Sequence, residues 1–285
     1  MTTHITDPDY EQCIVTFIDV LGFRSLINER SAADIRHVLA TLRTSTEPPR
    51  EPPPRHSDEI RLQSQAFAVA VSDAVVRVRV YETQYSDGAF FLELLDLLHA
   101  QIACINEGVL IRAGLAVGSA HVGLLGDGPI FGPAMVRAFQ IESEEAIFPR
   151  VVVDDAAYMA FLTDERLRSE HNNFSEEQAY VDRLLRTGED GTRFIDYLYS
   201  SKSEFDHPAE YAAFLARHAN LIRDELASSH PGRVKRKFVW LARYHNEVVG
   251  TILRDFDSGE RDPAEYDGVT GDDPAIYFRR LLVTV

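Results

Sequence analysis

Residues 13–23 read CIVTFIDVLGF, and this stretch decides how the chain folds. Cys13 to Val20 is a short apolar run rich in β-branched and aromatic side chains, which predicts a buried strand. The Leu-Gly-Phe that follows predicts a tight turn directly after the strand. Asp19, the one charged residue of the stretch, therefore stands at the end of the strand, beside backbone N–H groups of the turn.

The second informative stretch is Gln65 to Val80, QAFAVAVSDAVVRVRV. Its apolar, β-branched composition predicts two strands, and the central Ser72-Asp73 pair suits the turn between them. We interpret it as a β-hairpin with Asp73 near its tip. Pairing of this hairpin with the first strand would bring Asp73 next to Asp19.

The remaining segments alternate between helical and strand-like patterns. Helices are predicted between Ser25 and Arg43, where Ser31 is a candidate N-cap, between residues 87 and 108, and over residues 133–147. Further strands are predicted over residues 109–117 and 150–153. This order predicts an α+β fold, a mixed sheet flanked by helices, and not a series of parallel βαβ units.

Three parts are expected along the chain. Residues 1–155 are expected to form the core domain. Residues 156–232 are polar and helical in pattern, and they are expected to form a helical insertion, a helical elaboration that follows the core. Residues 233–285 are predicted to give a strand that returns to the core and then an acidic tail. PPREPPP, residues 48–54, predicts an exposed loop without regular structure.

Composition and charge exclude some functions. The chain has 285 residues, 45% hydrophobic and 26% charged, which is enough for one large core. Its formal net charge is 29 − 45 = −16. This charge repels phosphate backbones and anionic lipid, so a nucleic acid polymer is a poor partner. A small anionic substrate is still possible where local arginines or bound cations reverse the potential.

The sequence also predicts a cytoplasmic protein. It contains no run of 18 uncharged apolar residues, and its N-terminus lacks a basic patch followed by an apolar stretch, so neither membrane insertion nor secretion is indicated. Cys13 and Cys104 both stand within apolar segments, where a reduced cysteine behaves as a small hydrophobic residue. No disulfide is expected.

Asp19 and Asp73 are candidate ligands of divalent cations. Phosphoryl transfer needs cations that acidify an attacking hydroxyl and neutralise a leaving pyrophosphate, and carboxylate oxygens are suitable ligands for them. Taken singly, an aspartate at the end of a strand is more often a turn or cap residue. The order of the surrounding motifs favours the chemical role.

Four segments carry a resemblance to a known family: FIDVLGF, VSDAVVRV, LIRAGLAVGSAHVG and IFGPAMVRAFQIES, in this order. Together they resemble the catalytic core of class III adenylate and guanylate cyclases, over about residues 13–155. The resemblance implies the cyclase-like fold of that family, a ferredoxin-like or palm sheet flanked by helices. It also implies that a nucleoside triphosphate is closed to a cyclic monophosphate plus pyrophosphate with two divalent cations, Mn²⁺ or Mg²⁺.

The resemblance assigns roles to individual residues. Asp19 and Asp73 correspond to the metal ligands, which makes them catalytic, and the Val20 carbonyl is a further possible ligand. Arg112 stands where the family has an arginine that grips the β- or γ-phosphate. The remaining residues expected to contact substrate are those of the strand end and the phosphate-cradling turn, namely Phe17, Leu21, Gly22 and Phe23.

The helix after Phe131-Gly132 departs from the family. There, the family has an asparagine and, four residues on, an arginine that stabilises the transition state, whereas this chain has Val136 and Gln140. Arg137, one residue from the asparagine position, is the candidate catalytic cation in their place. The alternative is that Arg137 is a cation on the helix surface.

The positions that read the base depart as well. Purine cyclases carry a lysine or glutamate four residues before the second aspartate, and an aspartate or cysteine three residues before the helix glycine. This chain has Val69 and Pro129. The combination looks like the bacterial pyrimidine cyclases of the Pycsar antiphage system, and residues 235–248 also resemble the ending of that group. The substrate would then be UTP, which we favour, or CTP.

The resemblance implies partners too. Class III sites form between two subunits, so a homodimer is expected. A cyclic pyrimidine nucleotide would act on a separately encoded effector in antiviral defence, with no direct contact implied. Two alternatives remain: a purine cyclase with unusual base contacts, and an inactive nucleotide-binding regulatory domain. A P-loop enzyme and a zinc hydrolase are excluded, because neither GxxxxGK[ST] nor HExxH occurs.

Overall fold

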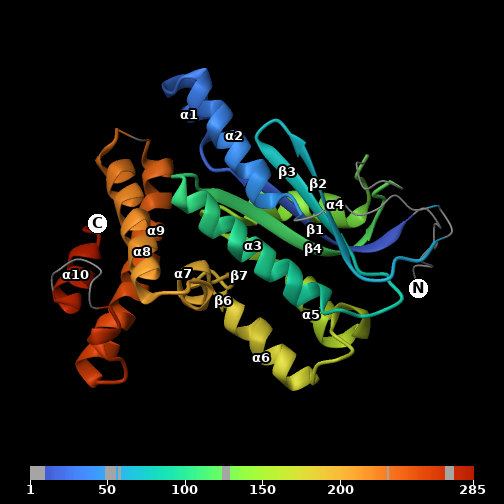
Figure 1. Ribbon diagram of the computed structural model, residues 1–285. Coiled ribbons are helices and arrows are strands. Elements are labelled where there is room, and N and C mark those ends of the chain that lie inside the picture. Colours follow the sequence, from blue (N-terminus) through green and yellow to red (C-terminus); the bar gives the residue numbers. More distant parts are fainter. Residues whose placement is uncertain (1–9, 49–55, 57–58, 124–128, 230, 267–272) are drawn as a thin grey trace. The chain divides into compact units, whose positions relative to one another are not determined.

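The computed structural model of the protein describes residues 10–48, 56, 59–123, 129–229, 231–266 and 273–285. Within them, seven strands form one sheet in the order β2-β3-β1-β4-β5-β7-β6 (Figure 1). Most neighbours are antiparallel, and β4 and β5 are parallel, so the sheet is mixed. The strands are β1 Glu11–Val20, β2 Gln65–Val71, β3 Ala74–Val80, β4 Ile111–Ala120, β5 Val151–Val153, β6 Leu185–Thr187 and β7 Arg193–Ile195.

Helices account for most of the other described residues. The α-helices are α1 Phe23–Glu29, α2 Ala32–Thr46, α3 Ala89–Asn106, α4 Pro133–Gln140, α5 Asp155–Thr163, α6 Phe174–Leu184, α7 Tyr197–Ser200, α8 Pro208–Ala227, α9 Gly232–Ser258 and α10 Pro274–Leu281. A π-helical turn, Ile141–Glu145, continues α4. Short 3₁₀ turns are Glu165–Leu167, Ser201–Glu204 and Pro263–Tyr266. The expected mixed sheet flanked by helices, with a C-terminal helical elaboration, is therefore confirmed.

The chain divides into two compact units. Unit 1 comprises residues 1–100 and 111–195 and contains the sheet, whereas unit 2 comprises residues 101–110 and 196–285 and is helical. The predicted boundaries at residues 155 and 232 do not coincide with this division. Strands β6 and β7 extend the sheet beyond residue 155, so the core unit is longer than the sequence pattern indicated.

The central strand β1 behaves as its sequence predicts. It pairs antiparallel with β3 on one side and with β4 on the other. Strands β2 and β3 form the predicted hairpin, and Ser72 in its turn has φ 59°, a left-handed value that suits a tight turn. Ser31 is the N-cap of α2, with a reciprocal capping box to Asp34, as expected from the sequence.

The two faces of the sheet differ because side chains alternate along a strand. Cys13, Val15, Val76 and Val78 are buried in a core that includes apolar side chains of α4. On the opposite face, Figure 1 shows α3 crossing the sheet. There the guanidinium groups of Arg77 and Arg79 on β3 hold Glu93 of α3, with Nε to Oε distances of 2.9 Å for both. One face is thus apolar, and the other contains a buried ionic network.

Gly114 of β4 lets α4 approach the sheet closely. A Cβ atom at this position would lie 2.4 Å from the Ala138 carbonyl oxygen and 2.6 Å from the Glu142 nitrogen. Real Cβ atoms do not come so near, so only glycine fits here without a shift of the backbone. The close packing fixes where the π-helical turn lies over β4.

Among the described residues, one helix, α3, is long and apolar enough to cross a membrane by length and composition. Its window has a mean hydropathy of 1.3, and 61% of it is buried inside the protein. Burial of this extent is typical of the core helix of a globular domain.

The prediction of a strand within residues 233–285, which belong to unit 2, is wrong. No strand is found in the described part of this range: residues 232–258 form the 27-residue helix α9. Phe238, Leu241, Val248 and Ile252 are buried on one side of it, at helical spacing. The β-branched and aromatic composition of this segment had favoured a strand, but burial of one helical face against α8 and α10 outweighs that preference.

The predicted loop and tail are only partly described. The helix α9 continues to Ser258, and a 3₁₀ turn follows at Pro263–Tyr266, so the first half of the expected acidic tail has helical structure. Residues 267–272 lie outside the described residues, as do residues 49–55 of the predicted proline-rich loop.

A chain of buried polar side chains links the helices of unit 2. The Nε2 atom of His245 lies 3.2 Å from the Leu281 carbonyl oxygen, and the two Nδ1 atoms of His218 and His245 are 3.0 Å apart. The Nε2 atom of His218 lies 3.0 Å from the Tyr197 hydroxyl. Burial lowers the pKa of both imidazoles, so both are neutral near pH 7. Because a carbonyl only accepts, His245 donates to it, His218 donates to His245, and Tyr197 donates to His218.

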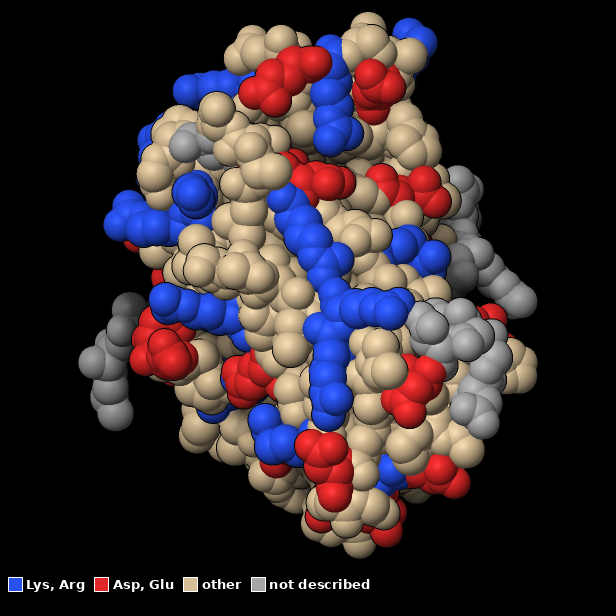
Figure 2. Space-filling view, turned by 90° about the vertical axis from the view of Figure 1, so that its left-hand side faces the viewer, with Lys and Arg blue, Asp and Glu red and all other residues tan. Residues whose placement is uncertain are grey.

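The net charge is not spread evenly. Figure 2 shows lysine and arginine side chains forming a run across one face, with acidic side chains beside them. In the same figure, neither sign covers the face completely. Arg233, Lys235 and Arg236, at the start of α9, are exposed and form a solvated basic cluster. The global charge of −16 therefore does not determine the potential at any one site.

Candidate active site

Asp19 and Asp73, which are 54 positions apart, meet at one end of the sheet. In the register of β1 and β3, Asp19 is opposite Ala74, the residue after Asp73. The Val20 N–H donates to the Asp73 carbonyl at 3.3 Å, which ties the end of β1 to the hairpin turn. The structure therefore brings the two predicted metal ligands together, as expected from pairing of the hairpin with the first strand.

The surroundings of Asp19 disfavour an isolated negative charge. Burial raises the pKa of this carboxyl group, two hydrogen bonds from Arg112 lower it, and the adjacent Asp73 carboxylate raises it again. The net pKa is above the ordinary value. Two carboxylates this close repel each other unless a cation lies near both, which is the situation in a metal site.

Arg112 is the cation beside Asp19. The two residues are opposite each other on β4 and β1, and the Nε and Nη2 atoms of Arg112 donate to Asp19 Oδ2 at 3.2 and 3.0 Å. Its side chain is 23% exposed, so it is reachable from solvent. The structure therefore places Arg112 in direct contact with one of the two predicted metal ligands.

A third carboxylate, from Glu142, was not predicted from the sequence. It lies in the π-helical turn after α4 and is buried, and its Oε1 atom is 2.6 Å from Arg112 Nη2. Its position depends on the π-turn and on Gly114 across from it, neither of which shows in the helical periodicity. The short motif QIES offered the only hint in the sequence.

The turn after β1 has the expected shape. Gly22 has φ 76° and precedes α1, and its carbonyl accepts from the Ser25 and Leu26 N–H groups. The neighbouring Leu21 is half-buried, and Phe23 anchors the turn in the core. Glycine is favoured at the middle position because a Cβ atom disfavours a left-handed backbone. The turn leaves the exposed Gly22 backbone near the carboxyl end of β1.

Phe17 lies two residues before Asp19 and on the same face of β1. Its ring meets the ring of Phe139 of α4 edge-on, with centroids 5.2 Å apart. Phe139 is 48% exposed and Val136, three residues earlier, is 55% exposed. These side chains form an apolar surface on α4 close to the aspartates.

Arg137 is not brought to the aspartates in the single chain. Its Nε and Nη2 atoms donate to the two carboxylate oxygens of Asp154 at 2.9 and 3.0 Å, and Nη1 lies 2.8 Å from Glu145. Its side chain is 40% exposed. Within one chain the described contacts of Arg137 are those of a surface ion pair, and a catalytic role requires a second subunit.

The residues in the base-reading positions are both apolar. Val69 is half-buried on β2, opposite Val76, and Pro129 is exposed before α4. Neither side chain has a hydrogen-bonding group. At these two positions the side chains therefore offer no donor or acceptor to the edge of a purine.

Asp19 and Asp73 supply some, but not all, of the ligands that a divalent cation needs. Asp19 and Asp73 offer carboxylate oxygens, the ligands that Mg²⁺ and Mn²⁺ prefer, and their mutual repulsion favours a cation between them. In the part of the chain that the structure describes, no group of three or more His, Cys, Asp or Glu side chains converges on one point. Oxygens of a bound triphosphate would have to complete the coordination.

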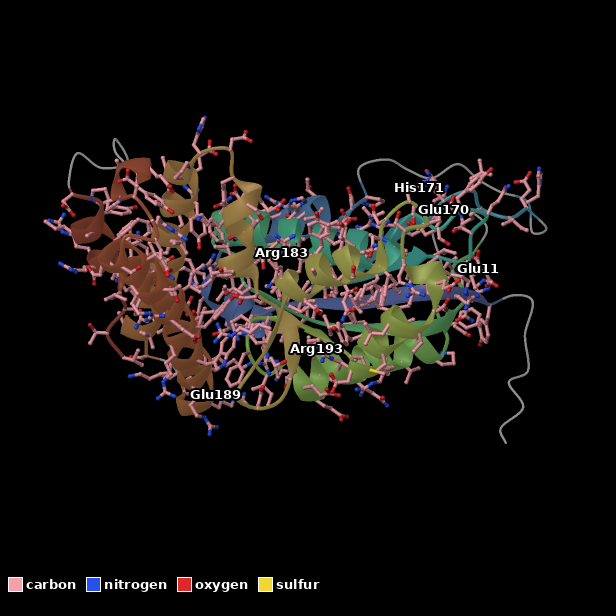
Figure 3. All side chains as sticks on the ribbon, turned by 90° about the horizontal axis from the view of Figure 1, so that it is seen from below. Glu11, Glu170, His171, Arg183, Glu189 and Arg193 are labelled. Atoms are coloured by element: carbon pink, nitrogen blue, oxygen red, sulfur yellow. The ribbon has the colours of Figure 1, made fainter. Side chains whose placement is uncertain are left out.

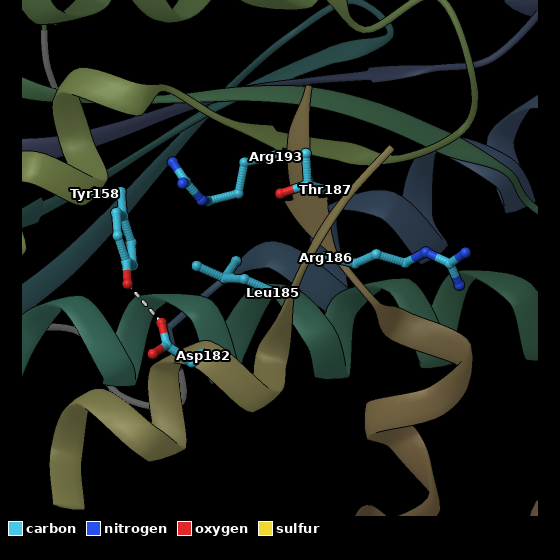
Figure 4. Close-up of a pocket in the computed structure, with 6 residues that line it drawn as sticks. All are labelled: Tyr158, Asp182, Leu185, Arg186, Thr187 and Arg193. Carbon is cyan, nitrogen blue, oxygen red and sulfur yellow. Dashed lines mark hydrogen bonds between the residues drawn. The ribbon is translucent and has the colours of Figure 1, made fainter. Parts of the chain in front are cut away.

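One hollow of about 180 Å³ lies elsewhere in unit 1, at the β6 edge of the sheet. It is lined by Tyr158, Asp182, Leu185, Arg186, Thr187 and Arg193 (Figure 4). The Tyr158 hydroxyl donates to Asp182 at 2.6 Å, and Arg193, which Figure 3 also labels, lies over the Tyr158 ring and pairs with Asp155. Asp182 and Arg193 are thus engaged with neighbouring side chains, and the carboxylate pair, not this hollow, is the candidate active site.

Comparison with known proteins gives structural similarities alone. No protein-family model and no curated protein matches the chain. The guanylyl cyclase domain of a RhoGC fusion protein from the aquatic fungus Blastocladiella emersonii is 15% identical, with a TM-score of 0.38, over 65% of this chain and 95% of that one. The guanylyl cyclase Cya2 is 12% identical, with a TM-score of 0.39, over 53% and 78%. A bacterial light-regulated adenylyl cyclase is 13% identical, with a TM-score of 0.35, over 54% and 81%.

Proposed function

We propose that this protein is a nucleotidyl cyclase that uses two divalent cations, and that its substrate is a pyrimidine nucleoside triphosphate. The observation that carries the proposal is the meeting of Asp19 and Asp73 beside Arg112 at the end of β1. Two carboxylates and one guanidinium in this arrangement suit a triphosphate with its cations. The motif resemblance over residues 13–155 supports the same activity.

The reaction joins two parts of one molecule. The 3′-hydroxyl oxygen of the ribose bonds to the α-phosphorus, the bond from that phosphorus to the β-bridging oxygen breaks, and pyrophosphate leaves while the hydroxyl proton passes to solvent. Bound cations would acidify the hydroxyl and neutralise the leaving group. Asp19 and Asp73, with the Val20 carbonyl, would hold the cations.

The other residues would position the triphosphate. Arg112 would pair with the β- or γ-phosphate, because its guanidinium is at the rim of the site and offers several donors. The turn Leu21-Gly22-Phe23 would place backbone N–H groups near phosphate oxygens. Phe17 would contact the substrate from the same strand.

The base would be a pyrimidine, with UTP favoured over CTP. Val69 and Pro129 offer no hydrogen bonds where purine cyclases read their base. The cyclic product would serve as a second messenger in antiviral defence, acting in the cytoplasm on a separately encoded effector. This part of the proposal depends on the resemblance to the Pycsar cyclases.

A homodimer would complete the site. Val136 and Phe139 form an exposed apolar surface on α4 beside the aspartates, which suits contact with a second copy. In such a dimer Arg137 of one chain would leave Asp154 and stabilise the transition state at the aspartates of the other chain.

The first test is an assay of the purified protein with each of ATP, GTP, CTP and UTP in the presence of Mn²⁺. The products are separated by chromatography and identified by mass spectrometry. The expected product is cyclic UMP, or cyclic CMP, together with pyrophosphate. Asp73→Asn should lower the turnover at least about 100-fold, since it removes cation-binding charge while preserving the shape of the side chain. Normal turnover by this variant would contradict the two-cation mechanism, and a cyclic purine product would contradict the base assignment.

Mixing of two inactive variants tests the dimer. Asp73→Asn lacks a cation ligand and Arg137→Ala lacks the proposed transition-state cation, so each alone should be inactive. In a mixed dimer, one site combines intact aspartates with an intact Arg137, and activity should reappear. Absence of any recovery on mixing, with exchange of subunits verified, would contradict a shared site.

A further inference from the structure

Glu142 adds a buried carboxylate beside Arg112, and the proposed reaction assigns it no role. Its side chain is 4% exposed, against 18% for Asp19. Its distance to Arg112 Nη2, 2.6 Å, is shorter than the 3.0 Å from the same nitrogen to Asp19. A buried carboxylate is strongly disfavoured without a cation, and Arg112 is a cation within ion-pair distance of Glu142.

Arg112 and a bound cation would compete for Asp19. Both Nε and Nη2 of Arg112 donate to the same oxygen, Asp19 Oδ2. Positive groups repel each other at such short range, so a cation bound at this oxygen would compete with the guanidinium. A displaced arginine needs another anion to remain ordered near the site.

We propose that Glu142 is a positioning residue that retains Arg112 when Asp19 releases it to bind a divalent cation, leaving the freed side of Arg112 available for the triphosphate. This inference rests on the proposed cyclase function and adds the means by which the phosphate-binding arginine is held. In the cation-free protein Arg112 bridges Asp19 and Glu142, and in the loaded protein it bridges Glu142 and phosphate.

The local backbone suits this role. Besides the side-chain pair, Arg112 Nη1 donates to the Glu142 carbonyl at 3.4 Å, so both parts of Glu142 hold the guanidinium. The π-helical turn Ile141–Glu145 and the close approach at Gly114 fix Glu142 against β4. Single π-helical turns inside helices are frequent at functional sites, where they aim a side chain that a regular helix would direct elsewhere.

The test measures Mn²⁺ binding to the full chain without nucleotide, from the electron paramagnetic resonance of free Mn²⁺. Glu142→Gln should weaken binding about tenfold, because Arg112 then remains on Asp19 and competes with the cation. Glu144→Gln is the matched control: it removes the same charge from the same turn, but Glu144 is exposed. It should change the dissociation constant less than about twofold, as is usual for a screened surface charge.

A second comparison separates positioning from general electrostatics. In an Arg112→Ala background, Glu142→Gln should produce no further tenfold loss of Mn²⁺ affinity, because the effect acts through Arg112. An undiminished loss in that background, or a wild-type dissociation constant in Glu142→Gln alone, would overturn the proposal. Glu142→Asp keeps the charge on a shorter side chain and should give an intermediate affinity, which provides a usable variant if Glu142→Gln does not fold.

Failure of the proposed function would show differently. If Mn²⁺ binding to the wild-type chain is insensitive to Asp73→Asn, the two-cation site itself is wrong, whatever Glu142 does. If that binding depends on Asp73 but not on Glu142, only the positioning role is wrong.

Discussion

Gly114 shows how one residue without a side chain controls the candidate site. It lies opposite Phe17 on β1, and the backbone of the turn after Ala138 covers it. The contacts made across this glycine place Glu142 beside Arg112. The chemistry of the site therefore depends on a position that has no functional group.

Gly114→Ala should destabilise unit 1 by about 2 kcal/mol, because an added methyl group in a tight contact forces the backbone apart. It should also lower any cyclase activity, since Glu142 would move away from Arg112. Urea denaturation followed by far-ultraviolet circular dichroism measures the change. Gly232→Ala is the control: its added Cβ would have no neighbour within 4 Å. Equal stability of the two variants would contradict the packing argument.

At the scale of elements, ion pairs hold strand β3 and helix α3 together. Glu93 of α3 is fully buried between Arg77 and Arg79, and Asp96, one turn on, also pairs with both. Burial alone would raise the pKa of Glu93, but the two guanidinium groups lower it below its ordinary value. Arg77 also donates to the Thr46 carbonyl at the end of α2. Three elements thus depend on one buried carboxylate.

Glu93→Gln should destabilise unit 1 by about 3–5 kcal/mol, because it leaves two buried guanidinium groups short of a counter-charge. Asp96→Asn should cost less, since the Asp96 side chain is 36% exposed and partly screened by water. Denaturation curves of the two variants, compared with the wild type, give the difference. The reverse order would show that Asp96 carries the network.

Much of the element pattern is predictable from local sequence. The strand of CIVTFIDV, the hairpin around Ser72-Asp73 and the N-cap at Ser31 were all predicted, because alternation, turn residues and caps act over a few residues. The pairing of Asp19 with Asp73 followed from the hairpin. These features need no knowledge of distant contacts.

Other features depend on tertiary packing and were missed. The helix α9 was predicted as a strand because its β-branched and aromatic residues were given more weight than the helical spacing of Phe238, Leu241, Val248 and Ile252. The π-helical turn that carries Glu142 lies against Gly114, a tertiary contact that the local sequence does not show. The pairing of Arg137 with Asp154 joins a helix to the end of a strand and has no local sequence pattern.

At the scale of the molecule, unit 2 should lose stability in acid. The buried imidazoles of unit 2 are neutral because burial lowers the pKa of His218 well below 6.5 and that of His245 to about 4. In the unfolded chain both titrate near 6.5, so the unfolded state binds protons first as the pH falls. Unit 2 is thus fully stabilised above pH 6.5 and loses stability as the pH falls toward about 4.

Fluorescence of Trp240, the single tryptophan of the chain, reports on unit 2, where it stacks on Tyr244. The urea midpoint of its transition should fall between pH 7 and pH 4.5, and His218→Leu/His245→Leu should flatten this dependence. His171, exposed beside Glu170 (Figure 3), serves as the control, and His171→Gln should leave the slope unchanged. A midpoint that does not move with pH would contradict the assignment of neutral buried imidazoles.

The hydrogen-bonded imidazoles of unit 2 should also report how often this unit opens. A single carbonyl, that of Leu281, sets the direction of every hydrogen bond from His245 through His218 to Tyr197. The ring N–H protons in this chain are buried, so in heavy water they can be replaced by deuterium only when the helices separate. Their nuclear magnetic resonance signals would persist for the lifetime of the closed unit, and the rate of their disappearance would measure how often it opens.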